Sequence, residues 1–271
     1  MTSFLFPRFF MCMLTACVTY SASATPAPTT PAPTTPAPTT PAPNATNSTS
    51  PDSVQTTLQP FFARYKTEWK LGWFSVDIEA ERSLRQLASG HWLLSFEAET
   101  SAAALKETSE FSLNQGRIQP LEYRYRASGL FNEPDRTLLF SPDLKLVKDM
   151  ENNKDYPQAW EDEVQDNLTY MLQASLDLAQ PDAHEQKADP LHYAVFEKKR
   201  VKDFQFRIIG EEQLNTKIGK LKTIKIEQVR QKKGREVFAW FAIERHYQLV
   251  RLVDKEKGKT RYQIDITDLK D

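Results

Sequence analysis

The feature that most constrains the fold is a two-residue alternation of apolar and polar side chains, which begins near Leu58. It runs through residues 61–71 and returns over residues 74–80, 92–98, 106–113 and 121–127, and again in several stretches between residues 193 and 266. Glycines separate many of these stretches. Because successive side chains of a β-strand point to opposite faces of a sheet, the pattern predicts half-buried strands in an antiparallel meander.

One segment has a helical period instead. Residues 163–179 place apolar side chains three or four positions apart, and the acidic residues 161–163 lie where a helix N-terminus favours negative charge. We expect one amphipathic helix, with Leu168 and Leu172 facing the concave side of the sheet and Gln173 exposed. The predicted fold is mainly β: a curved antiparallel sheet, or open barrel-like meander, with one packed amphipathic helix (α+β).

The first 24 residues have the character of an export signal. They contain no acidic residue, one basic residue, Arg8, and an apolar run over residues 9–16. That run is much shorter than the ~20 apolar residues of a spanning helix, so it predicts a signal peptide. We therefore expect an exported chain with no transmembrane span in its mature part.

Two processing sites compete within this signal. An A-x-A pattern ending at Ala24 predicts cleavage that leaves Thr25 as the new N-terminus. Residues 14–17 (LTAC) resemble the bacterial lipobox, in which Cys17 would be acylated. The first interpretation is slightly preferred, because the apolar run before Cys17 is short, and both stay open. Cys12 and Cys17 are the only cysteines, so the mature domain is expected to have neither a disulfide nor a thiolate nucleophile.

A proline-rich segment follows the signal. Residues 25–44 repeat the motif TPAPT, and the composition stays polar for about ten more residues. Proline fixes φ and favours extended polyproline II, which makes such a repeat a spacer. We predict a disordered Pro/Thr-rich tether over residues 25–57 and a single β-rich domain over residues 58–271. Most of the chain's 16 Phe and 9 Tyr and all 5 Trp lie in that domain and can supply its core.

Charge is unevenly distributed along the chain. The net charge of −1 argues against a general nucleic-acid binder. Residues 52–190 carry 14 Lys and Arg against 24 Asp and Glu, whereas residues 191–271 carry 20 against 12. The second part could be a separate basic binding module, or one sheet could bring acidic and basic strands together as cross-strand pairs. The second interpretation needs no partner and is preferred.

Several stretches are similar to a known family. The sequence QPLEYRY at residues 119–125 resembles a P-x-x-Y-x-Y strand of domain-of-unknown-function family 3108, a group of exported bacterial proteins. DNLTYML at residues 166–172 resembles a helix that opens with Asp in that family. Residues 210–212, 216–220 and 238–242 resemble the C-terminal hairpins of that family. The likeness spans residues 58–266, implies an envelope location and an antiparallel sheet curved around one helix, and supplies no catalytic residue.

The sequence offers no motif for catalysis or metal binding. Its four histidines form neither H-E-x-x-H nor H-x-H, and there is no G-x-S-x-G, S-x-x-K or glycine-rich phosphate loop. The carboxylate pairs Glu79/Glu81 and Glu97/Glu99 are expected on the solvent face of strands, not across a cleft. We predict no catalytic residue, no metal ligand and no cofactor; a triad assembled from distant Ser, His and Asp has no support.

Side chains on the inferred inward face are the remaining candidates for a binding site. They are Trp69, Trp92, Phe96, Tyr123, Tyr125, Leu168, Leu172 and Trp240. Core packing is the simpler interpretation of these residues. The alternative is that the curved sheet and its helix enclose a cavity for a lipid-like or hydrophobic ligand, an argument by analogy between folds.

Three functional hypotheses follow, in order of preference. The first is a non-enzymatic envelope protein, in the periplasm or anchored on the periplasmic side of the bacterial envelope, that binds a hydrophobic ligand or an envelope component. The second is a structural or assembly factor that binds another envelope protein through a sheet edge or its basic strands. The third is a hydrolase with no visible motif.

Overall fold

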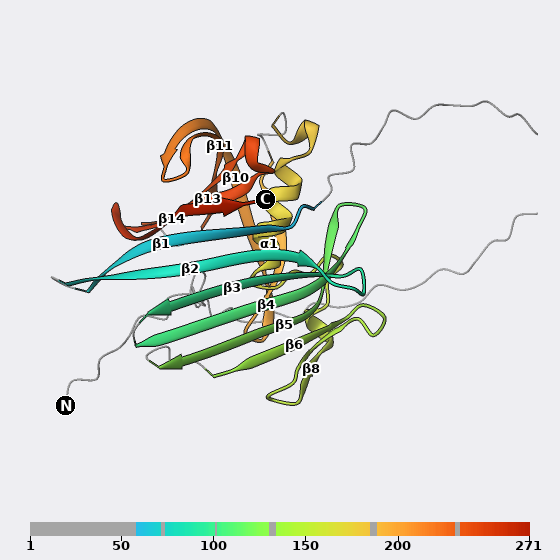
Figure 1. Cartoon of the computed structure of the whole chain (residues 1–271). Helices are drawn as coiled ribbons and strands as arrows, with labels where there is room; N and C mark the ends of the chain where they lie inside the picture. The colour runs from blue at the N-terminus through green and yellow to red at the C-terminus, as the bar shows by residue number, and fades with distance from the viewer. Residues whose placement is uncertain (1–57, 72–73, 101, 130–133, 185–188, 231–233) are drawn as a thin grey trace, which may run out of the picture.

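The structure is a computed structural model that describes residues 58–71, 74–100, 102–129, 134–184, 189–230 and 234–271 (Figure 1). The predicted signal peptide, processing sites and tether lie outside the described residues. Within them, the chain forms one antiparallel sheet of 14 strands, one α-helix and three short 3-10 helices. This confirms the predicted fold class of a mainly β protein with one packed helix.

The first eight strands follow one another along both the chain and the sheet. They are β1 (Phe61–Leu71), β2 (Phe74–Gln86), β3 (Trp92–Thr100), β4 (Ala103–Asn114), β5 (Arg117–Gly129), β6 (Arg136–Ser141), β7 (Leu146–Asp149) and β8 (Lys154–Tyr156). The helices η1 (Pro157–Ala159), α1 (Thr169–Leu178) and η2 (Pro181–His184) come next.

The remaining six strands form the other half of the sheet. They are β9 (Leu191–Glu197), β10 (Arg200–Thr216), β11 (Gly219–Val229), β12 (Arg235–Ala242), β13 (Gln248–Glu256) and β14 (Lys259–Lys270), with η3 (Ile243–Arg245) between β12 and β13. Strand β1 joins the halves, because it pairs with β2 on one side and with β14 on the other. From β1 the order runs to β8 in one direction and through β14 to β9 in the other.

The sheet curves around α1 until its two ends approach each other (Figure 1). Phe196 of β9 lies 6.5 Å from Phe140 of β6 and 5.4 Å from Tyr156 of β8, measured between ring centroids. The end strands β8 and β9 do not pair with each other. Instead Gln165 lies along β9, where its N–H donates to Ala194 O (2.7 Å) and its carbonyl accepts from Phe196 N–H (2.8 Å). The sheet is therefore curved and open.

The predicted alternation sets which side chains enter the interior. In β3, Trp92, Leu94, Phe96 and Ala98 are buried while the residues between them are more exposed. The turn between β4 and β5 also follows from the sequence, because Gln115 and Gly116 both have positive φ (49° and 78°), as in a type I′ turn that suits the twist of a hairpin.

Helix α1 packs on the interior with two faces. Tyr170, Met171, Ala174 and Leu178 join a cluster with β9–β13, whereas Leu172 and Leu176 join a cluster with Leu84 and its neighbours on β3–β5. Each side of the curved sheet is therefore tied to the helix by apolar contacts, which position it inside the concave face.

The helix is shorter than the sequence predicts. It begins at Thr169, so the acidic residues 161–163 precede it and are not in its first turn. Asp166 supplies the negative charge there, since its Oδ1 accepts from the N–H groups of Leu168 (2.8 Å) and Thr169 (2.9 Å). Leu168 is the N-cap residue and is partly buried, packed against the core and not within a helical turn.

The prediction that Gln173 is exposed is wrong. It is 2% exposed. Its Oε1 accepts from Ile118 N–H (2.8 Å), and its Nε2 donates to Gly116 O (3.1 Å) and to Asp177 Oδ1 (2.9 Å). Gln173 thus joins α1 to the β4–β5 hairpin, a contact that helical periodicity alone does not reveal.

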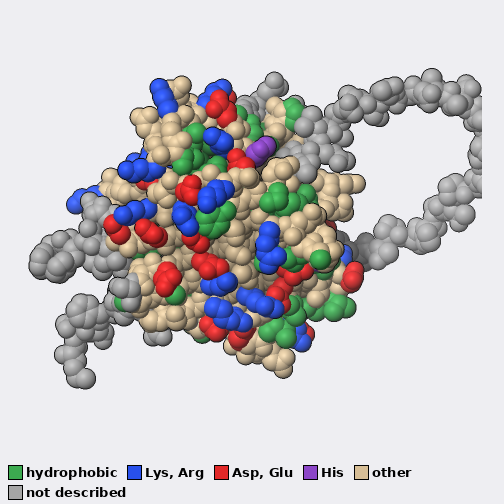
Figure 2. Space-filling model, in the orientation of Figure 1, with side chains coloured by type: hydrophobic (Ala, Val, Ile, Leu, Met, Phe, Trp, Pro, Cys, Tyr) green, Lys and Arg blue, Asp and Glu red, His purple; other side chains and the backbone are tan. Residues whose placement is uncertain are grey.

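The preferred interpretation of the uneven charge, one sheet with opposite charges across neighbouring strands, agrees with the junction of the two parts, where the register places Arg64 opposite Asp268 and Lys66 opposite Asp265. Many other ion pairs join neighbouring strands within one part of the chain, such as Lys106 with Glu97 (2.6 Å) and Arg207 with Glu227 (2.7 Å). Most neighbouring strands are consecutive in sequence, so most cross-strand pairs fall within one part, and β1 and β14 are the strands along which the two parts pair. Figure 2 accordingly shows basic and acidic side chains interspersed over the surface.

In the part of the chain that the structure describes, no helix has both the length and the apolar character to cross a membrane.

Candidate functional site: a pocket at the end of the sheet

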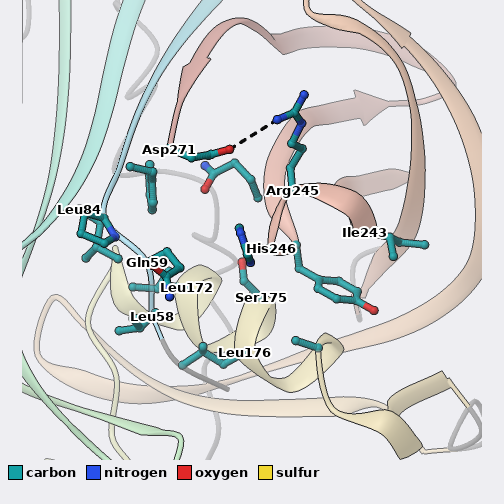
Figure 3. A pocket seen from close by; sticks show the side chains of 15 residues that line it. Leu58, Gln59, Leu84, Leu172, Ser175, Leu176, Ile243, Arg245, His246 and Asp271 are labelled. Carbon is teal, nitrogen blue, oxygen red and sulfur yellow. Dashed lines mark ion pairs between the residues drawn. The ribbon is translucent and has the colours of Figure 1, made fainter. Parts of the chain in front are cut away.

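A pocket of about 260 Å³ lies where the described chain begins and ends (Figure 3). Residues 58–61 enter β1 along one side of it, and the C-terminal half of α1 and the loop around η3 form other sides. Asp271, the last residue, also lines it. The pocket therefore unites segments that are far apart in the sequence.

One wall of this pocket is apolar. Leu58, Leu84, Leu172 and Leu176 line it, and each is buried, between 2% and 6% exposed. Leu172 and Leu176 lie four residues apart on α1, so one face of the helix presents both. Small-molecule sites are typically lined in this way, with a few polar groups that orient the ligand.

The opposite wall is polar. Arg245, His246 and Gln248, from η3 and the start of β13, form it, and Figure 3 shows Arg245 joined to Asp271, with 3.5 Å between Nη1 and Oδ2. Ser175 adds a hydroxyl group from the face of α1 that carries Leu172 and Leu176. His246 and Tyr247 both have left-handed backbone, with φ of 49° and 53°. Such backbone is costly for residues with a Cβ, so the surrounding structure must hold this loop in place.

Gln248 links the pocket to a buried tyrosine on β1. The Tyr65 hydroxyl accepts from Gln248 Nε2 (2.9 Å) and donates to Leu249 O (2.8 Å). Tyr65 is 4% exposed, and burial raises the pKa of its phenol. The hydroxyl therefore stays neutral, with both of these hydrogen bonds directed at β13.

Arg82 lies just behind the pocket wall. It points inward from β2 in register with Ala63 of β1 and Phe96 of β3, and it is 5% exposed. Its Cζ lies 5.4 Å from the ring centroid of Phe61, a pocket residue. Burial lowers the pKa of the guanidinium, and the nearby Tyr65 partly opposes this. Among the described residues, its Nη1 and Nη2 have no hydrogen-bond partner.

A second buried polar group lies further along the same row of the sheet. Glu107 of β4 is in register with Phe96 and is 4% exposed. Its Oε2 accepts from the Tyr123 hydroxyl (2.7 Å). Burial raises the pKa of Glu107 to about 7, the Tyr123 hydrogen bond lowers it, and the nearby Asp166 raises it further. Glu107 therefore titrates near neutral pH inside the protein.

Asp166 connects this group to the start of α1. Its Oδ2 accepts from Ser109 Oγ (2.5 Å), and its own N–H donates to Thr169 Oγ1 (3.0 Å). Burial raises the pKa of its carboxyl, whereas the hydrogen bonds from Ser109, Thr169 and Leu168 lower it. Two hydrogen-bonded pairs, Glu107 with Tyr123 and Asp166 with Ser109, thus lie at the start of α1, and Asn167 Nδ2 donates to the Tyr123 hydroxyl (3.5 Å).

The predicted binding residues do not form one site. Leu172 lines the pocket, and Trp92 belongs to the same apolar cluster as Leu172. Phe96, Tyr123, Tyr125 and Trp240 belong to the large core cluster, with Leu168 partly buried against it. The Trp69 side chain lies outside the described residues. Their role in ligand binding stays a prediction.

Sequence reasoning missed Arg82 and Glu107, although the signal was present. Arg82 continues the buried series Ile78, Ala80 and Leu84 on β2 at a spacing of two, and Glu107 continues the corresponding series on β4. A charged residue at a position where the alternation predicts a buried apolar side chain is unusual, and it can be recognised from the sequence.

No group of three or more His, Cys, Asp or Glu residues that could hold a metal ion occurs among the described residues.

The family is established by comparison of the sequence with family models. The model described as "Protein of unknown function (DUF3108)" matches residues 64–265. The chain belongs to this family. Among curated proteins, no sequence relative of this DUF3108 member is found.

Solved structures resemble this DUF3108 domain at low sequence identity. A beta-barrel-like DUF1849 protein from Brucella abortus is 10% identical and has a TM-score of 0.50, with 78% of this chain and 97% of that chain covered. The MucA/MucB complex of Pseudomonas aeruginosa is 11% identical, with a TM-score of 0.33 and coverage of 78% of this chain and 51% of that chain. The first likeness agrees with the barrel-like curvature of the sheet and concerns the fold alone.

Proposed function

We propose that this protein is a non-enzymatic binding protein of the bacterial cell envelope, which takes a small apolar or amphipathic ligand into the pocket at the end of its sheet. The observation that carries the proposal is the apolar wall of Leu58, Leu84, Leu172 and Leu176, opposite a polar wall. Such a two-sided lining both desolvates a ligand and orients it.

The predicted export signal and tether support an envelope location, with the domain held at a distance from its point of attachment. The family resemblance to exported bacterial proteins agrees with this location. We infer that the protein acts in the periplasm or on the periplasmic side of a membrane.

Binding is favoured over catalysis by where the perturbed carboxyl groups lie. Glu107 and Asp166 are buried in the interior, with their hydrogen bonds directed at Tyr123 and the start of α1. Neither lines the pocket. A general acid or base must reach the proton that it transfers, which these two carboxyl groups do not do from the core.

The alternative of an assembly factor that binds through a free sheet edge has weaker support. The edge strand β8 has only three residues, and the other edge strand, β9, is already hydrogen-bonded to Gln165. Short or covered edges oppose the addition of a foreign strand.

The fluorescent probe N-phenyl-1-naphthylamine tests the proposal, since its emission rises when it enters an apolar site. We expect saturable binding to the purified protein and its loss in Ala179→Trp, because Ala179 lines the pocket and an indole would fill it. The matched control is Gln180→Trp at the adjacent exposed position, which should bind as the wild type does. Absence of binding to the wild type, or equal binding to both variants, would contradict the proposed function.

A further inference from the structure

Arg82 is a buried arginine with two nitrogens that lack a hydrogen-bond acceptor among the described residues. A guanidinium group carries five N–H donors and keeps its charge in proteins. Arg82 is 5% exposed, and two of its nitrogens, Nη1 and Nη2, have no hydrogen-bond partner among the described residues. The Tyr65 hydroxyl and the Phe61 ring lie beside the guanidinium, but buried donors without an acceptor are unfavourable, so Nη1 and Nη2 call for an acceptor that the described residues do not supply.

The nearest polar groups of the interior are already engaged. The Tyr65 hydroxyl donates to Leu249 O, accepts from Gln248 and also interacts with the Arg82 guanidinium, whose Nη1 and Nη2 still have no partner among the described residues. Glu107 lies in the same row of the sheet, but Phe96 stands between it and Arg82, and its Oε2 accepts from Tyr123. Glu107 also titrates near neutral pH, so it is a poor permanent counter-ion for the guanidinium.

Arg82 is separated from the pocket by a single aromatic ring. The guanidinium lies against the ring of Phe61, which lines the pocket, and Leu84, two residues along β2 on the same face, belongs to the apolar wall. Gln248 lines the same region from the other side. Arg82 itself does not line the pocket, so a ligand would reach the guanidinium only after the Phe61 side chain turned aside.

We propose that Arg82 binds the anionic head group, a carboxylate or a phosphate, of a single-chain amphiphile whose hydrocarbon chain lies on the leucine wall of the pocket. This inference rests on the proposed function and names the chemical class of its ligand. The volume of about 260 Å³ falls slightly below the usual range for small-molecule sites, which suits one chain and not a two-chain lipid. Guanidinium is the side chain best matched to the paired oxygens of either anion.

Head-group preference tests the inference in the wild-type protein. Isothermal titration calorimetry below the micelle concentration would compare decanoate, decyl phosphate, decanol and decyltrimethylammonium, which share a chain length and differ in charge. A charge-assisted hydrogen bond to a buried group predicts at least tenfold tighter binding of the two anions than of decanol, and the weakest binding for the cation.

Each other outcome has a definite meaning. If decanol binds as tightly as decanoate, the anion inference fails while the proposed function stands. If none of the four compounds binds and the naphthylamine probe does not bind either, the proposed function itself fails. Titration with inorganic phosphate tests whether the site takes a free anion. If inorganic phosphate binds as tightly as decyl phosphate, the hydrocarbon chain does not contribute to binding and the inference fails.

Substitution of Arg82 separates binding from structure. In Arg82→Met, affinity for decanoate should fall at least tenfold while affinity for decanol is unchanged, and Arg82→Lys should retain part of the anion preference. Because the substitution removes a desolvated charge whose two terminal nitrogens have no partner, the unfolding midpoint of Arg82→Met should not fall. Arg85→Met, at an exposed position of the same strand, is the control. If a folded Arg82→Met protein binds decanoate as the wild type does, the assignment is wrong. If Arg82→Met does not fold, the same comparison is made with Arg82→Ala.

Discussion

Replacing Glu107 by Gln should remove much of the dependence of stability on pH between pH 5 and 8. Burial is the main reason that the pKa of Glu107 rises from its usual value near 4.5 to about 7 in the folded protein. The folded state therefore holds this proton more tightly than the unfolded state does. The stability that this provides is fully present below about pH 4.5 and is lost as the pH rises through about 7.

The size of the effect follows from the two pKa values. Their difference corresponds to about 3 kcal/mol of folding free energy lost between acidic and mildly alkaline pH. The new amide still has an oxygen that can accept from the Tyr123 hydroxyl, so Glu107→Gln should match the wild type near pH 5 and exceed its stability by up to about 3 kcal/mol at pH 8. Burial also raises the pKa values of Asp166 and Asp177, so a smaller slope of the same sign should remain.

Urea unfolding, followed by tryptophan fluorescence at pH 5, 6, 7 and 8, measures this difference without adding salt. Glu99→Gln, at an exposed position of β3, is the control and should leave the slope of stability against pH unchanged. Equal slopes for the wild type and Glu107→Gln would refute the reasoning, because they would mean that the folded protein does not hold this proton.

Three further predictions concern the helix and the signal. Gln173→Ala should cost about 2 kcal/mol by leaving buried backbone groups of the β4–β5 hairpin unpaired, whereas the exposed Gln180→Ala should stay within roughly 0.5 kcal/mol of the wild type in the same urea assay. Leu178→Ala, in a closed part of the core, should lower the free energy of unfolding by about 4 kcal/mol. Leu172→Ala should lower it less, by about 2 kcal/mol, because Leu172 borders the pocket. The reverse order would contradict the placement of the pocket. Cys17→Ser should mature normally with Thr25 as its first residue, as mass spectrometry of the exported protein would show, and a lipid found on the wild type and missing from the variant would favour the lipobox instead.

The sequence predicts the fold well where strands are long. In β1 to β5 the alternation identifies both the strands and the buried face, because nine or more residues are enough to separate a period of two from chance. It does not predict β6, β7 and β8, which have six, four and three residues. Trp240 shows a different limit: both faces of β12 are buried there, with Ala239 and Phe241 in the cluster that contains Tyr170 and Leu178, and Trp240 and Ala242 in another, so alternation alone does not tell which face borders the helix.

The site is less predictable because it is formed by contacts between distant segments. The pocket unites residues 58–61, part of α1, the η3 loop and the last residue, and no local pattern relates these four. The position of Gln173 depends likewise on a hairpin 55 residues away. Arg82 and Glu107 are intermediate cases. The alternation shows that each lies on the buried face of its strand. That Nη1 and Nη2 of Arg82 have no partner among the described residues, and that the pKa of Glu107 is raised, depends on the tertiary structure.

The position of Gln165 between the two ends of the sheet affects how the width of the interior is fixed. In a closed barrel, the radius is fixed by the number of strands and their stagger, and widening it breaks a whole ladder of hydrogen bonds. Here the seam beside β9 is held by two backbone hydrogen bonds at Gln165 and by an edge-to-face and a tilted ring contact of Phe196. Widening the sheet would therefore break the contacts at this seam and loosen those that tie α1 to both halves of the sheet, while the thirteen strand pairings could keep their register.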